Sequence, residues 1–392
     1  MGSSSTQHEV PSPNSRAGRL GELALNFLKI GAVAFGGPPA HIAMMEEEFV
    51  RRRGWVDHQR FLDMIGAVNL LPGPNSTELA LYIGLMRAGW LGLVVAGVSF
   101  ILPSAVLVLA LAWAYVRFGA LPQVAGVLYG TKPVVIVVVL QALWNLGRTA
   151  IKSAALAVLV LVDLALLVAG VHAIALLLGT GVALVMARWW QDHRHRAPHA
   201  ASSFAIFATA SGTAAGVSVA GLFFYFMKVG VLLFGSGFLL LAFLRADLVA
   251  KTHWLTETQL LDAIAVSQAT PGPLSTVATF IGYVLAGWTG AISATAGIFL
   301  PAFLLVAMSG WMIPRLRQSP LTGAFLDGVN AAALALMAAV TWQLGRASVI
   351  DIPTVALAIV SALLLFRFRV NSAWLMLGGA VAGLAATLFR FH

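Results

Sequence analysis

The stretch Pro72-Gly73-Pro74-Asn75-Ser76-Thr77 returns as Pro271-Gly272-Pro273-Leu274-Ser275-Thr276, 199 residues further along the chain. Both copies lie inside strongly apolar sequence. Proline removes a backbone donor and clashes with the preceding helical turn, so each triplet predicts a broken helix. Within a membrane, the freed backbone groups are tolerated only where they line protein or a water-filled cavity. Matching breaks in two hydrophobic halves therefore indicate a transporter binding site at the interface of two repeats.

The repetition extends well beyond the two triplets. Phe27–Gly31 matches Phe226–Gly230 at the same spacing of 199 residues, and the spacing becomes 198 after the triplets. Further matches follow in order: Trp55 with Trp254, Asp63 with Asp262, Trp90 with Trp288, Pro103 with Pro301, and Gly130 with Gly328. An ordered series with one deletion indicates internal duplication.

Composition places the chain in a membrane. Hydrophobic residues make up 59% of it and charged residues 10%, whereas a soluble domain carries roughly 25% charged residues. The absence of cysteine excludes disulfides and thiolate chemistry. The net charge of +9 is better explained by basic cytoplasmic loops than by nucleic-acid binding. No Walker motif is present, so ATP hydrolysis has no visible site.

The predicted fold is an all-α polytopic membrane protein with two inverted-topology repeats. We expect a disordered tail at 1–19, repeats at 20–190 and 216–392, and a cytoplasmic linker at 191–215. Each repeat should contain about five spanning helices, so about ten in all, plus a re-entrant helical hairpin broken at the triplet. An odd number of spans per half favours inversion, and an excess of Lys and Arg on the linker side places the linker in the cytoplasm.

These expectations correspond to particular segments. In the first half, helices are predicted at 20–36, 88–116, 122–147, 150–169 and 171–190, with hairpin arms at 57–71 and 74–87. In the second half they are predicted at 216–236, 287–314, 322–345, 352–367 and 371–390, with a hairpin at 257–286.

The restarted helices are candidate anion sites. The first four N–H groups of a helix lack internal partners, and the positive end of the helix dipole lies beside them. The hydroxyl and amide groups in the restarted turns add donors, namely those of Asn75, Ser76, Thr77, Ser275 and Thr276. Simple helix capping is the alternative for either copy alone.

Further candidates for substrate binding lie in the first helix of each half. Gly36, Gly37, Pro38 and His41 form a second break, and the matching positions include Gly235 and Ser236, without proline or histidine. A kink at a packing contact is the alternative.

Lys29 and Lys228 fall in mid-span, where an exposed charge costs ~2.5 kcal/mol or more, so they are expected to face a polar path. Snorkelling is their alternative explanation.

Three acidic residues are candidates for proton coupling. Asp63, Asp262 and Glu78 lie in the hairpins, where acids often relay protons. Structural pairing with a lysine or an arginine explains them equally well. The histidines between Gln191 and Ser203 are better explained as a solvated linker than as a metal site, and no metal or cofactor is expected.

These motifs resemble the chromate ion transporter (CHR) family. The resemblance rests on Phe35-Gly36-Gly37-Pro38-Pro39-Ala40-His41 and on each Pro-Gly-Pro triplet with the Ile-Gly pair that follows it, Ile83-Gly84 and Ile281-Gly282. Two copies in one chain are similar to the long-chain, bidomain members. The resemblance implies a multi-pass protein of the bacterial inner membrane that exports chromate, driven by the proton motive force, and so confers resistance. Glu78 stands near the position where the family often has glutamine.

The leading hypothesis is therefore a secondary transporter, not an enzyme, that exchanges chromate for protons within the lipid bilayer as a monomer or homodimer. Transport of sulfate or another tetrahedral oxyanion is the alternative within the same class. A membrane enzyme acting on a lipid phosphate is the alternative from another class, but the loops lack the acidic cluster that it requires.

Overall fold

The computed structural model describes residues 15–119, 121–193, 218–234 and 237–390, and in these ranges the regular structure is entirely helical. The all-α prediction is confirmed for this part of the chain. The expected sites Gly235 and Ser236 lie outside it, as do most of the predicted tail and linker. The first helix begins at Arg16, before the expected residue 20, because the Ser15 side chain caps it by accepting the Gly18 N–H at 3.0 Å.

The first half contains seven α-helices and one π-helix among the described residues. They are α1 (Arg16–Val33), α2 (Gly37–Glu46), the π-helix η1 (Glu47–Arg52), α3 (His58–Val68), α4 (Asn75–Phe118), α5 (Pro122–Ala150), α6 (Ala154–Val168) and α7 (Ala173–His193).

The second half repeats this order. Its elements are α8 (Val219–Leu232), α9 (Leu239–Leu244), the π-helix η2 (Arg245–Lys251), α10 (Glu257–Ala269), the 3-10 turn η3 (Leu274–Thr276), α11 (Val277–Gln318), α12 (Pro320–Ser348), α13 (Ile352–Phe366) and α14 (Ser372–Arg390).

The longest helix of each half is bent back on itself. In α4 the bend lies at Ala88 and Gly89, with φ of 67° at the glycine, and α11 bends in the same way at Ala286 and Gly287. Only glycine adopts this φ without strain. A Cβ on Gly84 would collide with backbone beyond the bend, so the two arms touch. The expected short arm followed by a long helix from residue 88 is therefore present.

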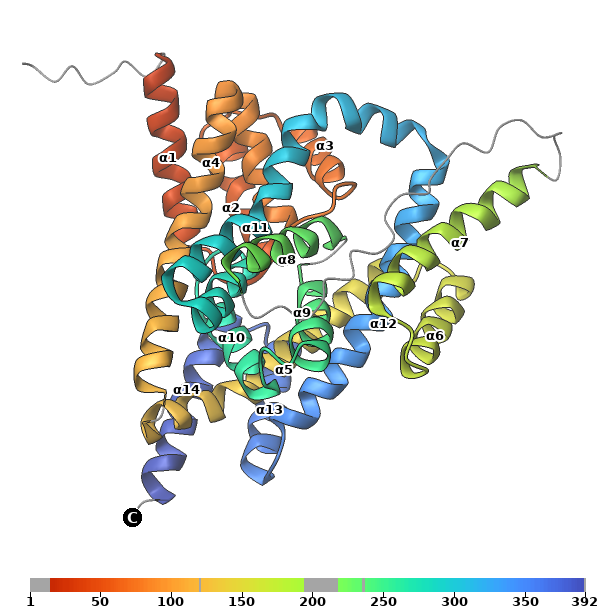
Figure 1. Ribbon diagram of the computed structural model, residues 1–392. Coiled ribbons are helices and arrows are strands. Elements are labelled where there is room, and N and C mark those ends of the chain that lie inside the picture. Colours follow the sequence, from red (N-terminus) through yellow and green to blue (C-terminus); the bar gives the residue numbers. More distant parts are fainter. Residues whose placement is uncertain (1–14, 120, 194–217, 235–236, 391–392) are drawn as a thin grey trace, which may run out of the picture.

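The two halves are interlocked rather than placed side by side. Helices α13 and α14 pack on α5 of the first half, and α6 and α7 pack on α12 of the second half (Figure 1). Glycines allow these close approaches: Gly130 lies against Gly379 and Gly383, while Gly328 lies against Gly181. Small residues at helix contacts are typical of membrane bundles.

Five helical segments of the described chain are long and apolar enough to cross a membrane, and four shorter helices are also apolar. This agrees with a membrane protein. The count of about ten spans and the re-entrant character of the triplet hairpins stay predictions.

Candidate functional site

Each Pro-Gly-Pro triplet is bound to the first long helix of the opposite half. The Gly73 N–H donates to Leu233 O at 2.8 Å, and the Gly272 N–H donates to Ala34 O at 2.9 Å. Ala34 and Leu233 directly follow α1 and α8, where backbone carbonyls lack partners within the helix. Gly73 and Gly272 occupy equivalent positions in the two halves, and so do Ala34 and Leu233, so the two bonds are related by the repeat. Both triplets therefore lie at the interface between the halves.

His41 connects the two triplets. It is fully buried on α2, with Nε2 3.2 Å from Ala34 O and Nδ1 3.1 Å from Ser76 Oγ. A carbonyl only accepts hydrogen bonds, so the neutral ring carries its proton on Nε2, and Nδ1 accepts from the Ser76 hydroxyl. A hydrogen-bonded series therefore runs from Ser76 through His41 and Ala34 O to Gly272.

Local sequence explains how His41 reaches this place. Gly36 adopts a φ of 105° and ends the extended link after α1, and prolines occupy the first turn of α2, where their missing N–H groups cost nothing. The next turn brings His41 inward, with its ring edge-on to Phe100 at 5.5 Å between centroids.

The second triplet is held by hydroxyl groups. The Thr276 hydroxyl donates to Pro273 O at 2.9 Å, so Ser104 must donate to Thr276 across 3.1 Å. Ser104 belongs to α4 of the first half and also lies directly over Gly272. Leu240 occupies the position equivalent to His41, and the buried Ser275 hydroxyl has no hydrogen-bond partner among the described residues.

Several buried polar atoms at the start of α4 also lack partners. Thr77 Oγ1 and both carboxyl oxygens of Glu78 are completely buried without hydrogen bonds in the part of the chain that the structure describes. The Glu78 carboxyl lies against Gly73. Asn75 is half satisfied, because its Nδ2 donates to Asn69 Oδ1 at 2.7 Å while its own Oδ1 has no partner among the described residues. The Thr77 hydroxyl is a donor left open at a helix start, which suits a small anion.

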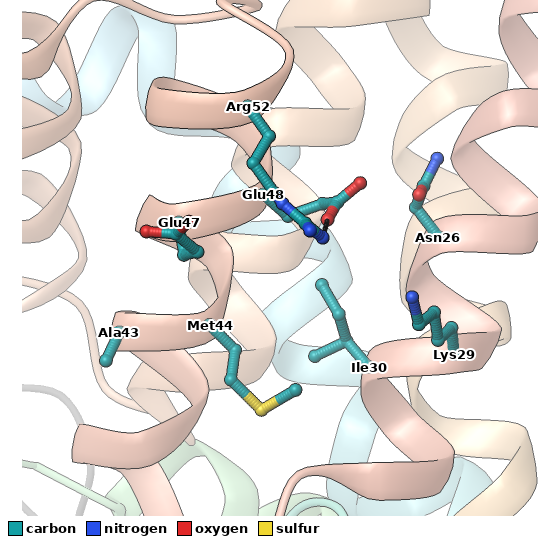
Figure 2. Close-up of a pocket in the computed structure, with 8 residues that line it drawn as sticks. All are labelled: Asn26, Lys29, Ile30, Ala43, Met44, Glu47, Glu48 and Arg52. Carbon is teal, nitrogen blue, oxygen red and sulfur yellow. Dashed lines mark hydrogen bonds and ion pairs between the residues drawn. The ribbon is translucent and has the colours of Figure 1, made fainter.

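Lys29 and Lys228 lie in a different region, each four residues before the end of its helix and not in mid-helix as expected. Lys29 lines a pocket of about 290 Å³ formed with α2 and η1, and no hydrogen bond or ion pair joins it to another described residue (Figure 2). Lys228 instead forms an ion pair with Asp247 on η2, at 2.9 Å.

Two of the three expected proton carriers have surroundings unlike those of Glu78. Asp262 is buried in an ion pair with Lys132 at 2.9 Å and accepts a hydrogen bond from the Tyr115 hydroxyl at 3.0 Å. Asp63 is exposed on α3. The structural alternative of pairing with a basic residue therefore describes Asp262 well.

The structure thus brings His41, Ser76, Glu78 and Thr276 together with the two triplets. The two lysines are not part of this group. Sequence reasoning missed Ser104, Tyr115 and Asp247. Asp247 was detectable, because it matches Glu48 at the 199-residue spacing. Lys132 had no role assigned from the sequence, and the structure pairs it with Asp262.

Comparison with known proteins gives a consistent result. The chromate transporter family model matches residues 21–186 and 220–384, one match in each half. A chromate transport protein of Cupriavidus metallidurans is 33% identical over 380 residues, covering 95% of this chain and 94% of that protein. A chromate transport protein of Pseudomonas aeruginosa is 31% identical, with 96% and 94% covered. No solved structure matches the chain.

Proposed function

Because this chain belongs to the chromate transporter family, we propose that it is a secondary transporter that exports chromate from the cytoplasm in exchange for protons. The main support is the junction of the two triplets, where the backbone of each half donates a hydrogen bond to the opposite half. His41 connects this junction to Ser76 at the start of α4. Such an interface between two repeats is where secondary transporters bind their substrates.

The proposed anion site consists of the two restarted helices. Its donors are the hydroxyls of Thr77 and Ser275, which are buried and unpartnered among the described residues, together with those N–H groups at the start of α4 and at η3 that do not already donate to Pro74 O or Pro273 O. Chromate is a dianion near neutral pH, so it suits donors at the positive end of a helix. Lys29 lies apart from these donors, in the pocket beside α1, and is proposed as a second contact for the anion.

Glu78 is the proposed proton carrier at this site. Its carboxyl group is fully buried at the start of α4, next to the N–H groups that we assign to the anion. A charged carboxylate and a dianion repel each other there, so anion binding and the protonation of Glu78 affect each other. Exchange requires that Glu78 carry its proton inward on the return step, after the anion has left. Asp63 and Asp262 remain the second choices for this role.

The surroundings of the protein follow from the same proposal. We place it in the inner membrane of a bacterium, with two inverted repeats, re-entrant hairpins at the triplets, a cytoplasmic linker, and external termini. Export from the cytoplasm would confer chromate resistance. Sulfate, another tetrahedral dianion, is the competing substrate, since donors arranged for one anion nearly fit the other.

Transport by the purified protein in vesicles tests the proposal directly. Chromate flux should require a proton gradient and should collapse when an uncoupler is added. The pH inside the vesicles should change in the direction opposite to that expected for co-transport. Flux that is unchanged by the uncoupler would remove the coupling, and a pH change of the other sign would replace exchange by co-transport.

Two variants test the assigned residues. Glu78→Gln keeps the shape of the side chain but cannot release a proton, so chromate binding should persist while proton-coupled flux is lost. Lys29→Ala should reduce transport without loss of membrane insertion. Sulfate competition separates the two substrates: if sulfate displaces chromate at equal concentration, the site is a general oxyanion site.

A further inference from the structure

The two lysines face acidic residues at equivalent positions, yet only one pair is formed. Lys29 and Lys228 are 199 residues apart, and so are Glu48 and Asp247. Both acids lie on π-helices that follow α2 and α9, so each half presents a carboxylate to its own first helix. The difference between the halves is therefore one of pairing and not of architecture.

In the second half the pair is closed. Lys228 Nζ lies 2.9 Å from Asp247 Oδ2, and the Asp247 side chain is 9% exposed. The Tyr225 ring covers the lysine, with its centroid 5.2 Å from Nζ. Charge pairing and ring contact together hold Lys228 in place, although its side chain stays 44% exposed.

In the first half the pair is open. Lys29 and Glu48 both line the 290 Å³ pocket, on opposite walls (Figure 2). Glu48 is held by Arg53, whose Nε lies 2.6 Å from Oε1, and by Arg52 at 3.4 Å from Oε2. The hydrogen bond from Arg53 lowers the pKa of Glu48, so this carboxylate stays charged.

Sequence explains why the halves differ. The positions equivalent to Arg52 and Arg53 are Lys251 and Thr252. The Thr252 hydroxyl donates to Asp247 O and leaves the carboxylate free for Lys228. In the first half, by contrast, the arginines compete with Lys29 for Glu48.

We propose that the two lysines exchange states during transport, so that Lys29 binds Glu48 when Lys228 leaves Asp247. The inference rests on the proposed function, because an inverted-repeat transporter changes its open side when its halves exchange conformations. Arg53 is then the residue that holds the first pair open. A lysine without its carboxylate partner is free to attract an anion. The unpaired lysine that attracts the substrate would therefore be Lys29 in one state and Lys228 in the other.

Thiol labelling tests this exchange in a chain that has no cysteine of its own. Ala43 lines the open pocket, and Ala242, at the equivalent position, is 1% exposed. In the unaltered background, Ala43→Cys should react rapidly with a small maleimide and Ala242→Cys slowly. Adding Arg53→Ala frees Glu48 for Lys29, so labelling should slow at position 43 and rise at position 242.

The expected change in each rate is about three- to tenfold, the range for losing one partly exposed charge-assisted hydrogen bond. Asp247→Asn should shift both rates in the same directions, because it releases Lys228. The matched control is Arg51→Ala, since Arg51 pairs with Glu46 and Glu47 but not with Glu48.

Rates that stay unchanged in both variants, or that rise together at both positions, would overturn the exchange. The labelling is done on purified protein without chromate. A reciprocal shift in a protein that fails to carry chromate would therefore contradict the proposed function and leave this inference standing.

Discussion

Replacing Gly73 by alanine tests the packing at the start of α4. Gly73 has a φ of 154°, and the three atoms nearest to a Cβ built on it all belong to Glu78, with Cδ at 2.9 Å. Because Glu78 is completely buried, its carboxyl group cannot move out into solvent. The added methyl group must therefore displace the proposed proton carrier or the triplet itself.

The cost has two parts that can be separated. An alanine at the φ of Gly73 costs about 1–3 kcal/mol, and overpacking a buried contact costs about 1–3 kcal/mol more. In a Glu78→Ala background the contact is gone, so Gly73→Ala should cost only the first part. Gly54→Ala is the matched control, because Gly54 has a φ of 59° and no atom within 4 Å of its Cβ position.

The unaltered protein, Gly73→Ala, Glu78→Ala and the double variant form a double-mutant cycle. Their free energies of unfolding in detergent, measured beside the Gly54→Ala control, give the coupling free energy between positions 73 and 78. We expect about 1–3 kcal/mol, with chromate binding reduced in Gly73→Ala alone. Additive effects, within about 0.5 kcal/mol, would show that Glu78 does not lie against the triplet, and the proton-carrier assignment would lose its geometric basis.

Two more predictions concern stability. Gly31→Ala should destabilise the protein by about 1–3 kcal/mol, because the added Cβ would collide with the backbone of Phe100. The control Gly21→Ala should cost nothing, since its Cβ position is open. Equal unfolding midpoints for the two variants would contradict this prediction. Lys132→Met should cost about 3–5 kcal/mol by leaving the Asp262 carboxylate buried without its charge partner, and adding Asp262→Asn should restore most of the loss, which thermal unfolding of the double variant checks.

Much of the architecture is predictable from the sequence, because duplication and helix breaking act locally. Matching triplets at residues 72 and 271 predict equivalent breaks, and the structure places α4 and η3 directly after them. The boundary between the arm at 74–87 and the helix at 88–116 was also expected, and Gly89 makes the turn there.

The contacts between the halves were not predictable in this way. No local pattern indicates that Ser104 reaches Thr276, because this pairing depends on how the halves interlock. The contacts of His41 with Ser76 and the Ala34 carbonyl lie within the first half, and no local pattern indicates them either. The pairing states of Lys29 and Lys228 were also hidden, because the difference comes from neighbouring residues on η1 and η2 and not from the lysines themselves.

In each half, the end of the first helix accepts a hydrogen bond from the other half. The carbonyls of Ala34 and Leu233 are satisfied by glycines from the opposite copy, and an unsatisfied carbonyl within a bilayer costs several kcal/mol. An ancestor with a single repeat would have needed a second molecule to supply the missing donor. Gene duplication would then have fused two partners that already assembled, which explains why the shared peptide contacts have outlasted the divergence of the side chains around them.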